Sequence, residues 1–162
     1  MRVNTGGGGG VIIVTLLLAL ALSVAPLPHW LEVLRPEWVT LVLIYWVMAL
    51  PQRIGVVSGW LIGLLLDVLH GTLLGQYALT LALVAYLTRL FHQRLRAYPM
   101  GQQSLVVLML VALELMLQLW IRGVQGAPPS HWSYWLPLFS SALLWPPLFV
   151  ILRDLRQRYQ VS

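Results

Sequence analysis

Six residues that are small or acidic recur at intervals of four in the middle of the chain. Positions four apart stay on one face of a helix, because about 3.6 residues make one turn. Small residues at this spacing let a second helix approach backbone to backbone, which is a main source of packing energy in lipid. The pattern therefore predicts either packing against another helix of the same chain or a docking face for a second membrane protein. Its members are Gly55, Gly59, Gly63, Asp67, Gly71 and Gly75.

Asp67 lies within one turn of the break at His70-Gly71. A carboxylate is disfavoured at the C-terminal end of its own helix, whereas unpaired N–H groups at the start of a following helix attract it. We expect Asp67 to accept hydrogen bonds from N–H groups around Thr72–Gly75 and thereby to lock a helical hairpin. A role in transport or partner binding is the alternative.

Glu114 is an acid near the middle of a long apolar run. An acidic side chain at the centre of a membrane helix costs roughly 2.5–3.5 kcal/mol on insertion scales. The sequence places no arginine at the same depth, so we expect a neutral carboxyl that is hydrogen-bonded to a polar neighbour. A partner contact and a proton or substrate site are the alternatives. Four polar residues fall at matching depth: Tyr45, Thr80, Ser140 and Ser141.

The sequence gives little evidence for a metal site or a catalytic site. His29, His70 and His131 fall near one predicted membrane face, but they come from separate loops without metal-ligand spacing. The sequence contains no Ser-His-Asp order, phosphate-binding loop or paired carboxylates. We therefore expect no enzyme activity, no metal and no cofactor.

The composition indicates which elements must position these residues. Of 162 residues, 59% are hydrophobic and 9% are charged, the mean hydropathy is +0.82, and cysteine is absent. These values exclude a soluble domain, a disordered chain and a disulfide scaffold, and they predict a single all-α transmembrane domain over residues 1–162. The runs 36–50 and 54–69 are short enough to form a tight hairpin. The run that begins at residue 11 follows a flexible leader, Gly6–Gly10. The six predicted spans are 11–27, 36–50, 54–69, 72–91, 104–121 and 132–152.

The distribution of arginines predicts the orientation of these spans. With both termini in the cytoplasm, only Arg35 and Arg122 lie outside, which agrees with the preference of positive charge for the inner side. The excess of arginine indicates contact with anionic membrane lipid, and nucleic acid is not an expected partner. Ser23–Ala25 resembles a signal-peptide cleavage site, but Pro26 disfavours cleavage, so we expect the first span to be retained. The cytoplasmic arginines are Arg2, Arg53, Arg89, Arg94, Arg96, Arg153, Arg156 and Arg158.

Several short motifs resemble the rod shape-determining protein MreD family of Gram-negative bacteria, from about Arg35 to the C-terminus. They are Leu34-Arg35-Pro36-Glu37-Trp38, Tyr45-Trp46, Ala49-Leu50-Pro51, the series Gly59, Gly63, Asp67, Gly71 and Leu74-Gly75, and Leu144-Trp145-Pro146. We expect helix packing or a partner interface at the glycine pattern, at Asp67 and at the pair Arg35-Pro36.

The resemblance implies a non-enzymatic, multi-pass component of the cell inner membrane that acts in rod cell shape and side-wall peptidoglycan synthesis. Its implied partners are MreC directly, and the filament MreB and the elongation polymerase–transpeptidase pair in a larger complex. The family is also similar in architecture to the substrate-binding subunits of vitamin transporters, so the alternative function is a subunit of a small-solute transporter. Self-association as a homodimer is left open.

Overall fold

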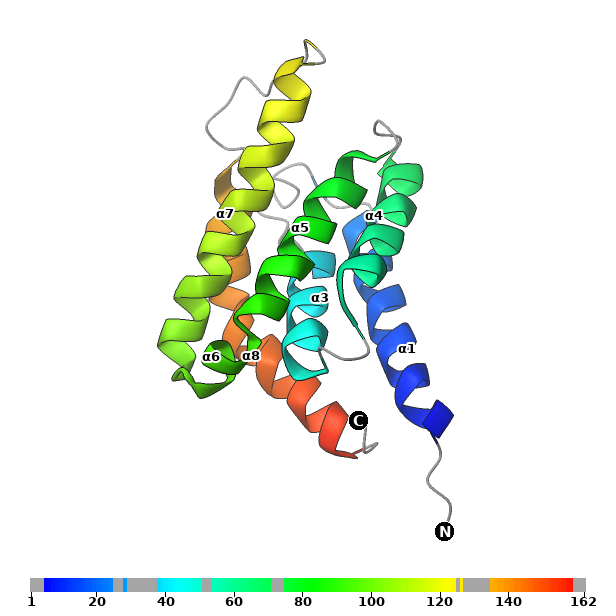
Figure 1. Cartoon of the computed structure of the whole chain (residues 1–162), viewed down its shortest axis with the longest axis vertical. Coiled ribbons are helices and arrows are strands. Elements are labelled where there is room, and N and C mark those ends of the chain that lie inside the picture. Colours follow the sequence, from blue (N-terminus) through cyan, green and yellow to red (C-terminus); the bar gives the residue numbers. More distant parts are fainter. Residues whose placement is uncertain are drawn as a thin grey trace.

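The computed structural model describes residues 5–24, 28, 38–50, 54–70, 75–124, 126 and 135–158. Within these residues all regular structure is helical (Figure 1), which confirms the all-α prediction. The helices are α1 (Thr5–Val24), α3 (Trp38–Ala49), α4 (Val56–His70), α5 (Gln76–Leu90), α6 (His92–Ala97), α7 (Met100–Val124) and α8 (Leu136–Arg158).

Helix α3 forms the centre of the bundle. Every residue from Val39 to Leu50 is buried, as expected for a helix that is hydrophobic on all sides. Helices α1, α5 and α8 pack around it, α7 packs on α5 and α8, and the short α6 lies across one end (Figure 1). Tyr45, Trp46 and Phe149 make edge-on ring contacts here, with centroids 5.2 and 5.4 Å from that of Tyr45.

Two expectations about the first half of the chain are wrong. The glycines Gly6–Gly10 are helical rather than a flexible leader, because α1 begins at Thr5. A helix satisfies its own backbone N–H and C=O groups, and in an apolar environment this can outweigh the low helix propensity of glycine. The predicted hairpin between the 36–50 and 54–69 runs is also absent from the described residues. Helix α4 packs instead on α5, against which its glycines allow the closest approach.

In the second half of the chain, the helices differ from the predicted spans mainly in the residues at which they begin and end. The expected 72–91 span starts later, as α5 at Gln76, and its end is followed by the separate α6. Helix α8 continues through Pro146 and Pro147 and extends past the apolar run to Arg158. Its polar end is rich in arginine and glutamine, which are good helix formers in water, and Arg158 pairs with Asp154 at 3.5 Å.

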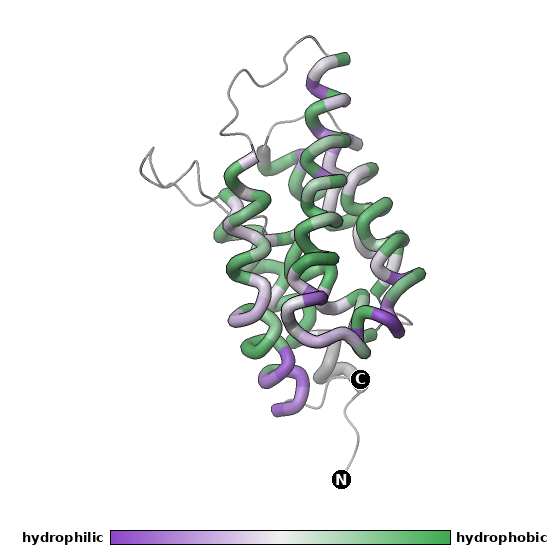
Figure 2. The backbone as a smooth tube through the Cα atoms, turned by 90° about the vertical axis from the view of Figure 1, so that its left-hand side faces the viewer, coloured by the Kyte–Doolittle hydropathy of each residue, from purple (hydrophilic) through white to green (hydrophobic). Residues whose placement is uncertain are grey.

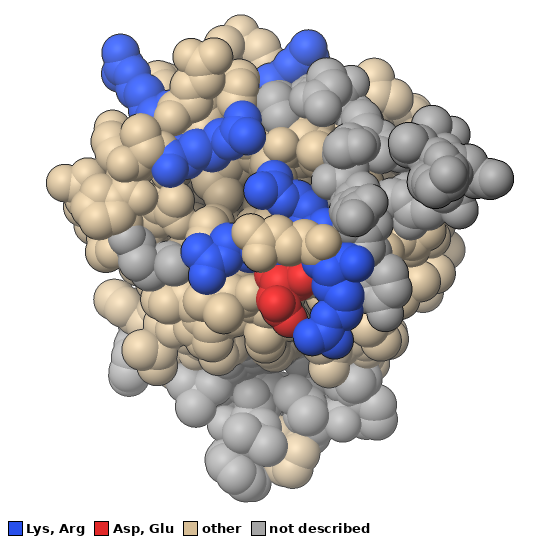
Figure 3. All heavy atoms as spheres, turned by 90° about the horizontal axis from the view of Figure 1, so that it is seen from below, with Lys and Arg blue, Asp and Glu red and all other residues tan. Residues whose placement is uncertain are grey.

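Several of the described helices are strongly apolar. Two of them, over Gly101–Val124 and Leu138–Arg158, are long and apolar enough to cross a bilayer, and α3 and α4 are shorter apolar helices. Hydrophilic segments gather at the lower end of the bundle (Figure 2), where α1 begins and α8 ends. Seen from below, arginine side chains spread over this end (Figure 3). The bundle thus has one strongly basic end.

Candidate functional site

The glycine pattern packs α4 against α5. A Cβ atom added at Gly59 would lie 2.8 Å from the backbone oxygen of Leu81, and one at Gly63 would lie 2.5 Å from the backbone nitrogen of Ala78. Both values are below normal contact distances, so only glycine fits at this separation. The face formed by Gly59 and Gly63 is therefore occupied by a helix of the same chain, as the first of the two interpretations predicts.

The pattern does not continue evenly at its ends. Gly55 is looser, since an added Cβ would come no closer than 3.6 Å, to the guanidinium of Arg89. Gly75 is the residue before α5 and has a φ angle of 104°, a left-handed conformation that favours glycine. Gly71 lies outside the described residues. The tight contact is therefore concentrated at Gly59 and Gly63.

The carboxylate of Asp67 caps α5 from the neighbouring helix. It is buried, and its Oδ2 accepts a hydrogen bond from the N–H of Gly75 at 2.7 Å while Oδ1 accepts one from Tyr77 at 2.8 Å. A longer bond of 3.4 Å comes from the N–H of Ala78. First-turn N–H groups have no partner within their own helix, so Asp67 takes the place of the N-cap side chain that Gly75 lacks. The predicted bonding to the next helix is present, shifted because α5 starts at Gln76.

Glu114 is fully buried between α7 and α3. The hydroxyl of Thr40 donates to its Oε1 at 2.6 Å, and the side-chain amide of Gln118 donates to Oε2 at 3.3 Å. Thr80, one of the expected neighbours, donates instead to the backbone oxygen of Tyr77. Neither Thr40 nor Gln118 is among the polar residues expected at this depth from the sequence. Gln118 could have been found, because residues four apart face each other on a helix.

We expect Glu114→Gln to be nearly silent if the carboxyl is neutral. Glutamine keeps its shape, can still accept a bond from Thr40, and can donate to the amide oxygen of Gln118 once that side chain turns, whereas the backbone N–H groups around Asp67 cannot turn. Glu114→Ala leaves Thr40 and Gln118 without this partner, at a cost of about 1 kcal/mol or less in a membrane interior. The measurement is complementation of a strain that lacks the protein by each variant at matched membrane levels. A normally inserted Gln variant that restores nothing would contradict the neutral carboxyl and indicate a titrating or charge-pairing role.

Further buried polar contacts join the helices around α3. The indole N–H of Trp46 donates to the hydroxyl of Thr15 on α1 at 2.9 Å. The side-chain amide of Gln103 donates to the backbone oxygen of Leu95 at 2.7 Å and accepts a 3.4 Å bond from the indole of Trp145. These contacts fix α6, α7 and α8 relative to one another. No sequence signal predicts the pairs Thr15–Trp46 and Gln103–Trp145, because their members are 31 and 42 residues apart in the chain.

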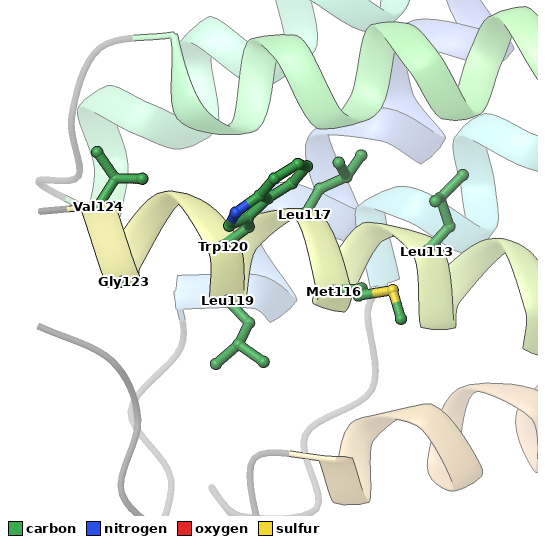
Figure 4. Close-up of a pocket in the computed structure, with 7 residues that line it drawn as sticks. All are labelled: Leu113, Met116, Leu117, Leu119, Trp120, Gly123 and Val124. Carbon is green, nitrogen blue, oxygen red and sulfur yellow. The ribbon is translucent and has the colours of Figure 1, made fainter.

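A hollow of about 760 Å³, which we call the α7 groove, lies against the C-terminal half of α7, away from the basic end (Figure 4). Trp120 and Val124 are 73% and 83% exposed there. A Cβ added at Gly123 would meet no described atom within 4 Å, so a second backbone can come close. The described residues that line this α7 groove are Leu113, Met116, Leu117, Leu119, Trp120, Gly123 and Val124.

Other predicted positions are not tested by this geometry. Arg35, Pro36, His29 and His131 lie outside the described residues. Among the described residues, no group of three or more potential metal ligands comes together.

The apolar bundle, its capped helix pair and its arginine-rich end define an all-helical, membrane-associated protein. The sequence model of the family described as "rod shape-determining protein MreD" matches residues 8–155. A protein of Haemophilus influenzae named "Rod shape-determining protein MreD" is 33% identical over 144 residues, which cover 89% of each chain. No solved structure matches the chain significantly. The chain belongs to the MreD family, whose description names a role in rod shape rather than a reaction.

Proposed function

We propose that this chain is a non-enzymatic, multi-pass scaffold of the cell inner membrane that regulates the machinery of side-wall peptidoglycan synthesis. Family membership supports a role in rod shape. The arrangement of polar and apolar groups supports a scaffold. Asp67 and Glu114 are buried and hydrogen-bonded between helices, whereas the apolar groove on α7 is open. The comparisons give no support to a transporter subunit.

The α7 groove is the surface we assign to the direct partner, the single-span protein MreC. Its residues are apolar along about three turns of α7, and Gly123 leaves space for close helix packing. Trp120 lies in the last turns of α7, away from the arginine-rich end of the bundle, where indole rings favour the membrane interface. MreB and the polymerase–transpeptidase pair would then join through the larger complex.

Co-purification with tagged MreC tests this assignment. We expect Gly123→Leu to reduce the recovered MreC about tenfold, equivalent to about 1.4 kcal/mol of lost packing, because the leucine side chain fills the groove. Gly101→Leu is the matched control, since Gly101 also lies on α7 with open space around it but at the other end. Equal recovery with both variants would contradict the α7 groove as the MreC surface, and capture of a second copy of this chain instead would indicate a homodimer.

The scaffold requires a defined topology, and reporter fusions measure it. We propose six membrane crossings with both termini in the cytoplasm, because α1 begins and α8 ends at the arginine-rich end of the bundle. A fusion at residue 162 should therefore report a cytoplasmic location, and a fusion near residue 127 a periplasmic one. A periplasmic C-terminus would contradict the six-span arrangement and every assignment of depth made from it.

A further inference from the structure

A second hollow, of about 440 Å³, lies between α5, α6 and α7 at the arginine-rich end. This volume falls in the usual range of small-molecule sites, about 300–1,000 Å³. Its lining consists of Leu87, Phe91, Arg94, Leu95, Tyr98, Val106, Met109, Leu110 and Leu113. We name it the α5–α7 groove. It is separate from the α7 groove, with which it shares only Leu113.

The α5–α7 groove is amphipathic along its length. Residues Val106 to Leu113 form an apolar wall that rises about 10 Å along α7, roughly two-thirds of one leaflet of a 30 Å hydrocarbon core. Arg94 and Tyr98 belong to α6 and the turn after it, at the basic end. An apolar channel with a basic mouth is complementary to a molecule that has an acyl chain and an anionic headgroup.

The mouth of the groove carries uncompensated positive charge. Arg94 is exposed, and among the described residues no carboxylate lines the groove and no hydrogen bond or ion pair engages its guanidinium. Arg89 and Arg96 are also exposed on neighbouring turns. A guanidinium binds phosphate with two parallel N–H donors, and basic pockets between membrane helices on the cytoplasmic side are typical sites for acidic lipid headgroups.

The walls of the groove are fixed in place rather than free to collapse. Leu95 is buried, and its backbone oxygen accepts the hydrogen bond from Gln103 of α7, which Trp145 of α8 holds in turn. On the open side, Phe91 and Met109 are 46% and 63% exposed. The groove is thus held open toward the surrounding lipid.

We infer that the α5–α7 groove binds one anionic phospholipid, with an acyl chain along α7 and the headgroup phosphate on Arg94. The inference rests on the proposed orientation, which puts the arginine-rich end at the cytoplasmic leaflet, but it does not depend on the scaffold role. An acidic lipid bound here stabilises the α5–α6–α7 corner and sets the depth of the bundle in the membrane.

Binding of phosphatidylglycerol and phosphatidylcholine with identical chains to the purified chain in detergent tests the headgroup contact. We expect phosphatidylglycerol to bind about fivefold more tightly, and Arg94→Gln to abolish this preference, from the usual effect of one arginine near an anionic surface. Arg153→Gln removes an exposed charge from the end of α8 that lies at the same end of the bundle, without touching the groove, and should keep the preference. Equal losses in both variants, or no preference in the unaltered chain, would overturn the proposal.

A second pair of variants tests the acyl chain. Met109→Trp fills the groove and should weaken both lipids at least severalfold, whereas Leu105→Trp, at an exposed position of α7 outside the lining, should not. Glycerol phosphate, which has the headgroup without chains, should not compete. Competition by glycerol phosphate, or unchanged lipid binding by Met109→Trp, would contradict a lipid site. None of these outcomes alters the MreC recovery measured with Gly123→Leu, so the two proposals fail separately.

Discussion

Gly63→Leu should disrupt the packing of α4 against α5. Even a single Cβ atom at Gly63 would lie 2.5 Å from the backbone nitrogen of Ala78 and the backbone oxygen of Tyr77. Backbone atoms cannot rotate away, so α4 and α5 must separate, and overpacking of this kind costs about 3 kcal/mol or more. Separation also pulls Asp67 from the N–H groups that it caps. The measurement is membrane level together with thermal stability in detergent.

Two controls isolate the role of the helix contact in this result. Leu61→Ile changes a half-exposed residue of the same helix and should be mild. Gly55→Leu should also be tolerated, because its nearest neighbour is the flexible side chain of Arg89, and Gly59→Leu should resemble Gly63→Leu. Stability of Gly63→Leu equal to that of Leu61→Ile would show that the two helices do not meet at this glycine.

Asp67→Asn should destabilise the fold by about 2 kcal/mol despite its nearly identical size. The carboxylate uses both oxygens to accept backbone N–H groups of α5, and hydrogen bonds to a charged group are each worth about 1.5–3 kcal/mol. Asparagine turns one acceptor into a donor, which then faces another N–H. Asp67→Ala removes both acceptors and should cost more. Thermal unfolding in detergent measures each difference.

Asp154→Asn is the matched control for this substitution. Asp154 is exposed and forms a surface pair with Arg158 at 3.5 Å, so its loss should change stability by less than about 0.5 kcal/mol. If Asp67→Asn and Asp154→Asn have the same small effect, Asp67 does not cap α5 in the folded protein.

Local patterns predict the α4–α5 contact because its determinants are close in sequence. Gly59, Gly63 and Asp67 share one helix face by spacing alone, and the N–H groups bound by Asp67 lie only 8 to 11 residues away. The interior position of α3 also follows from its sequence, which is apolar on every side. Because the residues that determine these features are close together in the chain, few other arrangements of the helices are compatible with them.

Features that depend on the packing of distant helices could not be predicted. Thr40 and Glu114 are separated by 74 residues, and depth counting suggests several equally suitable partners. The same limit applies to Gln103 and Trp145, and to the two grooves, because which side of α7 stays uncovered depends on where α5 and α8 pack. The extra length of α8 was missed for another reason, since an apolar-run criterion stops at the first arginines although they continue the helix.

Depletion of this protein in rod-shaped host cells tests the proposed scaffold role most directly, with imaging of cell shape and of newly inserted cell wall along the side walls. We predict rounded cells whose new wall is no longer dispersed along the cylinder, and full recovery when the unaltered chain is supplied. Rods of unchanged width and unchanged side-wall insertion, in cells where the protein is no longer detectable, would contradict a scaffold of cell-wall elongation.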